Sequence, residues 1–228
     1  MNVCGLQKLT LLDFPEHTAC TVFTGGCNLR CPFCHNASLV KGRAPTMDKE
    51  ELWSFFKKRA GLLDGVCISG GEPLLQPNIG EFIKELRQIG YKIKLDTNGT
   101  YPNILCSLLE EGLIDYVAVD LKNSPELYGK TVGIEGFDFE VIAKTMEILR
   151  AGKVPYEYRT TVVKPLHSLE SLEALGKLIA PDEPWFLQQF TDSGDILGEG
   201  LLPFSPDEMR TFAEKLKENN PSVSLRGL

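Results

Sequence analysis

The sequence has no long apolar run and no cluster of basic side chains. No stretch is long and apolar enough to cross a bilayer as a helix, so no membrane partner is expected. Lys and Arg total 24 against 31 Asp and Glu, a net charge of −7, so nucleic acid is not an expected partner either. The segment Met1–Thr10 lacks a basic stretch followed by an apolar one, which argues against a signal peptide and for a cytoplasmic location.

The seven cysteines are an odd number, and three of them lie within eight residues. Small secreted proteins instead use an even number of cysteines paired as disulfides. The pattern therefore predicts a reducing compartment and a metal site. Cys20 and Cys67 fall in predicted strands, where a free cysteine behaves as a small buried apolar residue.

Short β-rich segments alternate with amphipathic helical patterns along the chain. The predicted strands lie near Cys20–Thr24, Val66–Ser69, Lys92–Asp96, Tyr116–Asp120, Tyr156–Val163 and Trp185–Gln189, with a short closing strand at Ser222–Arg226. The predicted helices lie near Asp48–Arg59, Ile79–Ile89, Asn103–Glu111, Phe139–Arg150 and Leu169–Ile179, and a last helix begins at Ser205. Ser205 and Glu208 fit a capping box there. The alternation predicts βαβ units and a parallel sheet, in one α/β domain over residues 1–228.

Polar residues follow most of the predicted strands at their carboxyl ends. Three strands run into Ser69–Glu72, Asp96–Asn98 and Asp120–Lys122. The predicted strand at Tyr156–Val163 carries Arg159–Thr161, and the one at Trp185–Gln189 ends in Gln188–Gln189. In a parallel barrel these ends share one face, and that face carries the chemistry. One such end would be an ordinary polar loop, but several charged ends together indicate a site.

Cys27, Cys31 and Cys34 form a C-x3-C-x2-C pattern directly after the first predicted strand. Thiolates are soft ligands that suit zinc or iron–sulfur clusters. A structural zinc site usually has four protein ligands, and no fourth thiolate is nearby. His35 adjoins Cys34, and neighbouring side chains rarely reach one metal together. Three thiolates on a four-iron cluster would leave one iron open to a substrate, so the spacing favours the cluster over the zinc alternative.

This pattern resembles the motif of the radical S-adenosylmethionine (SAM) enzymes, and further elements follow in the family's order. Gly70–Pro73 resembles the GGEP stretch at the end of the second strand. Within the family, Cys34–Asn36, Leu95–Gly99 and Asp120–Lys122 resemble the activating enzymes of glycyl radical proteins, above all those of anaerobic ribonucleoside-triphosphate reductase and pyruvate formate-lyase. The resemblance extends from about Gly5 to Val163 and implies a partial (β/α)6 TIM-like barrel with a C-terminal helix, which agrees with the strand count.

The resemblance also implies cofactors. Cys27, Cys31 and Cys34 would hold one [4Fe-4S] cluster and act as the catalytic and metal-binding residues. Its open iron would bind SAM, and one electron would break a sulfur–carbon bond to give methionine and a 5′-deoxyadenosyl radical. The cysteine-rich insertion of some activators is missing, so one cluster is expected. Its electrons would come from a separate donor of the flavodoxin or ferredoxin type.

Seven other residues match cofactor-contacting positions of the family. They are Phe33, Gly70, Gly71, Glu72, Asp96, Lys122 and Arg159. The glycines would let the backbone approach the ligand, Phe33 would meet the adenine, and Asp96 and Lys122 would contact the ribose and the methionyl end. The ordinary alternatives are a strand-to-loop turn, packing under the cluster and surface ion pairs.

Four further expectations concern individual positions. Asp96, Thr97 and Asp120, with the Ala118 carbonyl, match positions that bind a monovalent cation in the pyruvate formate-lyase activator. The histidine that some activators place on the sixth strand is missing, so its contact falls to Gln189 or is absent. His17 and His167 lie in predicted loops and are expected to be solvated. Leu12–Pro15 precedes the first predicted strand and could line the mouth of the barrel.

Three functions remain open at this point. The resemblance favours an activating enzyme that abstracts hydrogen from a glycine of a partner glycyl radical enzyme, most of all anaerobic ribonucleotide reductase. The alternative is a radical SAM enzyme that acts on a small molecule, similar to 7-carboxy-7-deazaguanine synthase. Relatives of that kind tend to read Cys-Asp-Thr after the last cysteine, whereas this chain reads Cys34-His35-Asn36. A non-catalytic metal-binding interaction module is the third.

Overall fold

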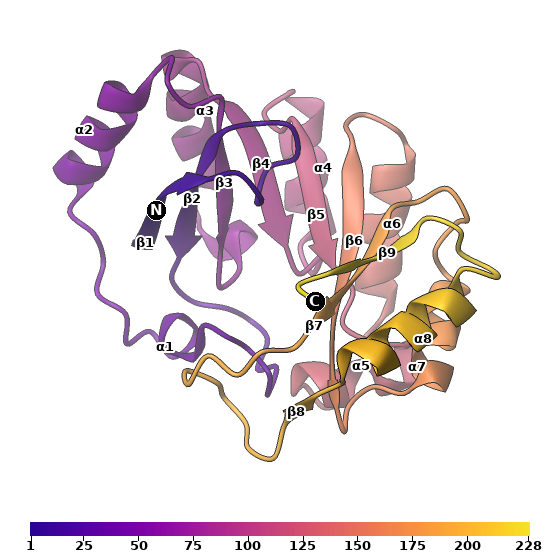
Figure 1. Cartoon of the computed structure of the whole chain (residues 1–228). Coiled ribbons are helices and arrows are strands. Elements are labelled where there is room, and N and C mark those ends of the chain that lie inside the picture. Colours follow the sequence, from indigo (N-terminus) through magenta and orange to yellow (C-terminus); the bar gives the residue numbers. More distant parts are fainter. The chain divides into compact units, whose positions relative to one another are not determined.

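The computed structural model describes residues 1–228 and shows strands and helices in alternation (Figure 1). The strands are β1 (Val3–Thr10), β2 (Ala19–Thr24), β3 (Gly65–Gly70), β4 (Lys92–Thr97), β5 (Tyr116–Asp120), β6 (Tyr156–Lys164), β7 (Trp185–Gln189), β8 (Leu202–Pro203) and β9 (Val223–Arg226). The helices are α1 (Ala37–Val40), α2 (Lys49–Arg59), α3 (Ile79–Ile89), α4 (Pro102–Glu110), α5 (Pro125–Val132), α6 (Glu140–Arg150), α7 (Leu169–Gly176) and α8 (Pro206–Leu216), with a 3-10 turn at Pro73–Leu75.

The predicted α/β class is confirmed: strands alternate with helices, and most of the paired strands are parallel. The bounds of the predicted strands agree with the structure within about one residue. Helix α7 ends at Gly176, three residues earlier than expected. At α8 the capping box is present, because Ser205 and Glu208 bond reciprocally through side chain and backbone. No helix is long and apolar enough to span a membrane.

The chain packs into two compact units. The first comprises residues 1–28, 38–118 and 141–155, and the second comprises residues 29–37, 119–140 and 156–228. The chain passes from the first unit to the second within β5, after Ala118. The cysteine motif is divided in the same way, because Cys27 belongs to the first unit, whereas Cys31 and Cys34 belong to the second. The prediction of a single domain stays a prediction.

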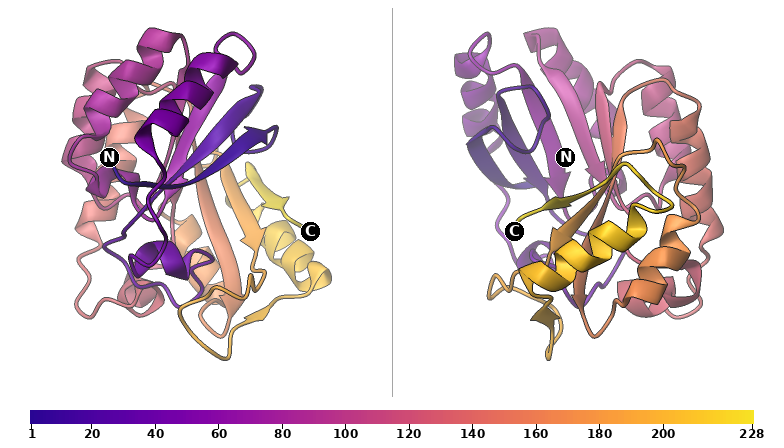
Figure 2. Two further views of the ribbon diagram at one scale, coloured as in Figure 1. Left: turned by 90° about the vertical axis from the view of Figure 1, so that its left-hand side faces the viewer. Right: turned by 45° about the vertical axis from the view of Figure 1, so that its right-hand side comes forward.

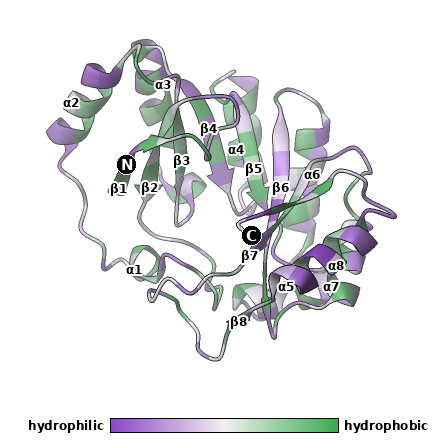
Figure 3. Cartoon of the chain, in the orientation of Figure 1, coloured by the Kyte–Doolittle hydropathy of each residue, from purple (hydrophilic) through white to green (hydrophobic).

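In the first unit, β2, β3 and β4 are parallel neighbours, so their carboxyl ends lie at one edge. Their central residues are wholly buried, among them Val22, Ile68 and Leu95. In Figure 3 strands β2 and β3 are mainly green, whereas helix α2 shows much purple. This pattern is expected for a covered sheet with helices that face water on their outer side.

Strand β1 was not predicted from the sequence. It is antiparallel to β2, and most of its residues are partly or fully exposed, so it shows no clear alternation of apolar and polar residues. The turn after it carries Leu12–Pro15 and ends at Ala19, the first residue of β2. This turn therefore lies at the amino end of β2, and the expectation that Leu12–Pro15 lines the carboxyl-end mouth is wrong. Phe14 instead packs inward and is 2% exposed.

In the second unit, β6, β7 and β9 are parallel neighbours, so the predicted closing strand is present. Figure 2 shows α8 alongside β9, both in yellow. Arg226 on β9 forms a bidentate ion pair with Glu157, with N–O distances of 2.7 and 2.8 Å, and Glu157 is 1% exposed. The Arg226 guanidinium also stacks 3.4 Å from the centroid of the Phe186 ring.

Candidate functional site

In the first unit, the loop that leads to Cys27 packs against the end of β3. A β-carbon on Gly71 would lie 1.9 Å from the Gly26 carbonyl oxygen, and one on Gly70 would lie 2.2 Å from the Thr24 nitrogen. Gly70 also has a φ of +122°, which other residues rarely adopt. Only glycine therefore fits here, and the backbone that these glycines approach is that of Thr24–Gly26. Whether they also contact a cofactor stays a prediction.

Glu72 is fully buried at the end of this glycine turn. Its Oε1 accepts hydrogen bonds from the Leu74 amide at 3.0 Å and the Thr97 hydroxyl at 2.8 Å. Its Oε2 accepts from the Asn98 amide at 2.7 Å. The carboxylate thus ties the end of β3 to the end of β4. This position gives Glu72 a structural task, and direct contact with a cofactor stays a prediction.

Asp96 projects from β4 beside a buried lysine that the sequence reading did not single out. Lys94, 1% exposed, donates a hydrogen bond to Asp96 Oδ1, and its ammonium lies 5.8 Å from the Tyr116 ring centroid. Buried lysines are rare unless they are paired, so Lys94 is best explained as the counter-charge of Asp96. Both oxygens of a carboxylate can accept hydrogen bonds, so the chemistry of this side chain suits a ligand hydroxyl.

In the second unit, Asp120, Lys122 and Arg159 form a charged cluster. Asp120 accepts from Lys122 Nζ and from Arg159 Nε, each at 2.9 Å. Burial alone would raise the pKa of Asp120, but the two cations outweigh it and hold that pKa well below its usual range. Burial alone would lower the pKa of Lys122, but the neighbouring Asp120 carboxylate raises it overall. Both groups are therefore charged at neutral pH.

Phe33, between Cys31 and Cys34, packs beside this cluster within the second unit. Phe33 is 3% exposed, its ring centroid lies 5.9 Å from Lys122 Nζ, and it meets the His167 ring edge-on with centroids 6.2 Å apart. The Arg30 amide donates to the Val132 carbonyl at 2.8 Å, and this bond fastens the loop to the end of α5. Helix α5 was not predicted from the sequence.

His167 is buried, 5% exposed, so the expectation that it is solvated is wrong. Its Nδ1 accepts from the Val163 amide at 3.2 Å, and its Nε2 lies 2.7 Å from the Lys122 carbonyl oxygen. This pattern fits a neutral ring with its proton on Nε2, and burial lowers the pKa of His167 accordingly. The histidine therefore supports both the Lys122 backbone and the Phe33 ring. No local sequence signal marked this role, because its partners are distant along the chain.

Two other expectations can be compared with the structure. Gln189, at the end of β7, donates from Nε2 to the Phe204 carbonyl at 2.7 Å, so its amide helps to hold the segment before α8. Cys20 and Cys67 are wholly buried, as predicted. No three His, Cys, Asp or Glu side chains are arranged to hold a single metal ion. A four-iron cluster differs from such a site, because each thiolate binds a different iron.

The comparison with known families decides the assignment. Residues 21–179 match the sequence model of the Radical SAM superfamily. The chain belongs to this superfamily. Membership makes the protein a radical SAM enzyme and implies a [4Fe-4S] cluster and SAM as its cofactors. The resemblance inferred from the cysteine motif is thereby confirmed.

Two curated relatives differ in how much of the chain they share. A protein of Methanocaldococcus jannaschii, provisionally named a glycyl-radical enzyme activating enzyme, is 32% identical over 98% of this chain and 95% of its own length. The AdoMet-dependent heme synthase of Methanosarcina barkeri is 33% identical over 62% of this chain, which is 41% of its own length. The second relative therefore shares only part of this chain.

Solved structures support the fold alone. Streptococcus suis SuiB, bound to its precursor peptide SuiA, matches with a TM-score of 0.68 and 17% identity. The match covers 91% of this radical SAM chain and 48% of that one. A likeness at this identity carries no conclusion about substrate.

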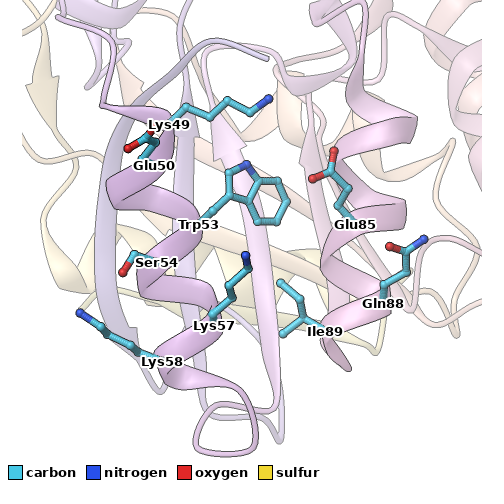
Figure 4. A pocket seen from close by; sticks show the side chains of 9 residues that line it. All are labelled: Lys49, Glu50, Trp53, Ser54, Lys57, Lys58, Glu85, Gln88 and Ile89. Atoms are coloured by element: carbon cyan, nitrogen blue, oxygen red, sulfur yellow. The ribbon is translucent and has the colours of Figure 1, made fainter.

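A separate groove of about 840 Å³ lies between helices α2 and α3 of the first unit (Figure 4). Trp53 lies between the helices there, with Lys49 and Lys57 on α2 and Glu85 on α3. The groove contains none of the residues that the radical SAM motifs single out, and its charges are mixed. We therefore do not place the predicted site in this groove.

Proposed function

We propose that this radical SAM enzyme is an activating enzyme, which abstracts a hydrogen atom from a backbone glycine of a partner glycyl radical enzyme. One observation carries the proposal: the relative provisionally named for that activity aligns with 98% of this chain and 95% of its own length. The similarity therefore includes the region after residue 179, where the superfamily match ends. The signature Cys34-His35-Asn36 and the strand end Asp120–Lys122 support the same group by resemblance.

The residues present fit the cofactors that the family implies. Cys27, Cys31 and Cys34 offer three thiolates and would hold three irons of a [4Fe-4S] cluster. When bound, the cluster and SAM supply a 5′-deoxyadenosyl radical after one-electron reduction. The protein's share of the work is to position the cofactors and to exclude water.

Specific residues would position SAM. Asp96, paired with Lys94, would accept hydrogen bonds from the ribose hydroxyls. Lys122 would hold the methionyl carboxylate, because an ammonium group has three donors and its bond to Asp120 uses one. Phe33 would pack near the adenine, and Arg159 would support Asp120 and so act on Lys122 indirectly.

The glycine turn would act mainly through its shape. Gly70 and Gly71 allow the backbone after β3 to lie against the Cys27 loop, and we propose that the methionine amino group binds beside this turn. Glu72 would keep the turn fixed to β4 through its hydrogen bonds to Thr97 and Asn98.

The resemblance also implies a monovalent cation at Asp96, Thr97 and Asp120, with the Ala118 carbonyl. Lys94 already neutralises Asp96, and Lys122 and Arg159 neutralise Asp120. The Thr97 hydroxyl donates to Glu72. An added cation would have to compete with these partners.

We propose anaerobic ribonucleotide reductase as the partner, with a flavodoxin or ferredoxin-type protein as the electron donor. The test is electron paramagnetic resonance of a candidate partner mixed anaerobically with this enzyme, a reductant and SAM. A glycyl doublet should form and should vanish when the partner's glycine is replaced by alanine. Efficient turnover of a small molecule, with no glycyl radical on any candidate partner, would overturn the proposal.

The second candidate is a radical SAM enzyme for a small molecule, similar to 7-carboxy-7-deazaguanine synthase. The relative named AdoMet-dependent heme synthase favours this class, although it shares only 62% of this chain. Deoxyadenosine release distinguishes the two candidates. A small-molecule enzyme should release it in proportion to that substrate, and an activating enzyme in proportion to the partner protein.

A further inference from the structure

The carboxamide of Asn98 lies beside the first cysteine of the motif, within the first unit. Asn98 follows β4 and is 6% exposed. Its Nδ2 donates to Asn28 Oδ1 at 2.9 Å and lies 3.8 Å from Cys27 Sγ, within reach of a long N–H···S hydrogen bond. Neither the sequence motifs nor the family match assigns a task to this side chain.

A closed ring of hydrogen bonds fixes the orientation of this amide. The Thr100 hydroxyl donates to Asn98 Oδ1 at 2.6 Å, Asn98 Nδ2 donates to Asn28 Oδ1, and Asn28 Nδ2 donates back to the Thr100 hydroxyl at 2.8 Å. The Thr100 amide also donates to Asn98 Oδ1, at 3.0 Å. Rotating the Asn98 amide by half a turn would set donor against donor at Thr100. The NH2 group must therefore face Asn28 and Cys27.

Glu72 holds the backbone of the same residue. Its buried carboxylate accepts the Asn98 amide at 2.7 Å and the Thr97 hydroxyl at 2.8 Å. Asn98 is thus fixed both at its backbone and at its side-chain oxygen. One Nδ2 hydrogen serves Asn28, and the other is left for the sulfur. A rigid donor costs no reorganisation when charge changes beside it.

We propose that Asn98 raises the reduction potential of the iron–sulfur cluster by donating an N–H···S hydrogen bond to the Cys27 thiolate. In the step concerned, one electron passes from an external flavodoxin or ferredoxin-type donor to the cluster, and no bond is made or broken. The reduced cluster is more negative, so a donor at a ligand sulfur stabilises it more than the oxidised cluster. The inference rests on the proposed role of Cys27 as a cluster ligand.

The test is a redox titration of the anaerobically reconstituted full chain without SAM, followed by electron paramagnetic resonance. Asn98→Leu removes the donor, and Asn98→Asp replaces it with an anionic acceptor. Both should shift the midpoint potential to more negative values, Asn98→Asp further. Thr100→Val frees the amide and should give a smaller shift in the same direction, whereas Thr100→Ser keeps the hydroxyl and should restore the wild-type value. An unchanged potential in Asn98→Leu at full iron content would overturn the inference.

A control variant separates the effect on the potential from a loss of stability. Asn220→Ala removes another buried amide, which donates to the Gly176 and Ile179 carbonyls, and should lower stability without moving the reduction potential.

If the Asn98 variants bind no cluster, the wild-type protein is transferred to D2O. Its iron–sulfur stretching bands in resonance Raman spectra should then shift, because the proposed hydrogen exchanges with solvent. Unshifted bands would count against the hydrogen bond.

Failure of the proposed function would look different. A protein that takes up zinc but no iron and sulfide would refute the cluster itself. A protein with a cluster that cleaves SAM but makes no glycyl radical would refute only the partner. A cluster whose potential does not respond to Asn98 would refute only the present inference.

Discussion

Glu72 in the first unit and Asp120 in the second are both carboxylates at the carboxyl ends of strands, but they are held by opposite kinds of partner. Glu72 is fully buried and accepts from backbone amides and a hydroxyl, all of them uncharged. The Asp120 side chain is 30% exposed and is bonded to two cations, Lys122 and Arg159. The first arrangement fixes backbone geometry, and the second fixes charge.

This difference has physical consequences. Neutral donors orient a loop without adding positive charge, and the stability that their hydrogen bonds contribute should not depend on salt concentration. Cations keep a carboxylate ionised and align an ammonium group for a ligand, but their contribution depends on pH and ionic strength. Cys27 therefore lies in the unit where Glu72 is bonded to neutral groups, whereas Cys31 and Cys34 lie in the unit that contains the charged cluster.

The largest effect is expected from replacing the motif cysteines, and it should be the same for cysteines of either unit. Cys27→Ala, Cys31→Ala and Cys34→Ala should each abolish the bound cluster, because each removes one of three thiolates, whichever unit it comes from. Iron and sulfide analysis of anaerobically reconstituted protein should fall from about four irons per chain to almost none. Cys67→Ala and Cys106→Ala are the matched controls and should keep their iron. Stoichiometric zinc without sulfide in the wild type would contradict the assignment.

Removing the neutral network should cost more stability than removing the charged one. Glu72→Ala leaves three donors without their acceptor in a buried site, and we expect a loss of about 3–5 kcal/mol in the free energy of unfolding. Glu72→Gln keeps one acceptor but sets an amide donor against a backbone N–H, so its loss should be smaller. Urea unfolding of the apo protein measures both. Equal stability of Glu72→Ala and wild type would show that the network is not formed.

Breaking the charged network should cost less and should depend on pH. Asp120→Asn should lower the free energy of unfolding by about 2 kcal/mol at pH 6, because two charge-assisted hydrogen bonds are lost from a partly exposed site. The pKa of Asp120 is lowered by folding, so its contribution is complete above the unfolded value of about 3.9 and fades as pH falls below it. The free energies of unfolding of wild type and variant should therefore converge as the pH falls from 5 to 3, a range that brackets the unfolded pKa of about 3.9. A constant difference would refute the pairing.

The smallest effect concerns cofactor affinity. Asp96→Ala and Lys122→Ala should each weaken SAM binding by about tenfold, as expected for loss of one charge-assisted hydrogen bond, while iron content stays intact. Lys94→Met should act in the same direction through Asp96, and combining it with Asp96→Ala should add little. Equilibrium binding to the clustered protein measures this. Normal affinity in both single alanine variants would remove these strand ends from the site.

Much of the fold could be predicted because its strands are short, apolar and closed by polar residues. β5 and β7 begin and end at the predicted residues, and β4 differs by one. β1 could not be predicted, because an edge strand with exposed residues and no strict alternation looks like a loop. Helix α5 begins at Pro125 and is capped by Gly133, both recognisable signals, but it is only eight residues long and only four residues separate it from the end of β5.

The chemical types of the site residues were visible in the sequence, and their connections were not. The cysteine spacing and the glycine turn are local patterns, so they could be read directly. His167 supports Phe33 and Lys122, and Glu72 accepts a hydrogen bond from the Asn98 amide; these contacts join residues far apart along the chain. The pairing of Lys94 with Asp96 could have been found, because residues two apart on a strand point to the same face.

Substitutions at Gly133 should disturb the cysteine loop, although this residue lies about 100 positions further along the chain. The residue sits at a φ of +69°, and a β-carbon there would lie 2.6 Å from the Arg30 carbonyl oxygen. Any side chain at this position would push against the backbone just before Cys31. A screen for inactive alleles should thus recover substitutions at Gly133 that leave every cysteine intact, and compensating changes should fall in the Leu29–Pro32 segment and not around the mutated helix end.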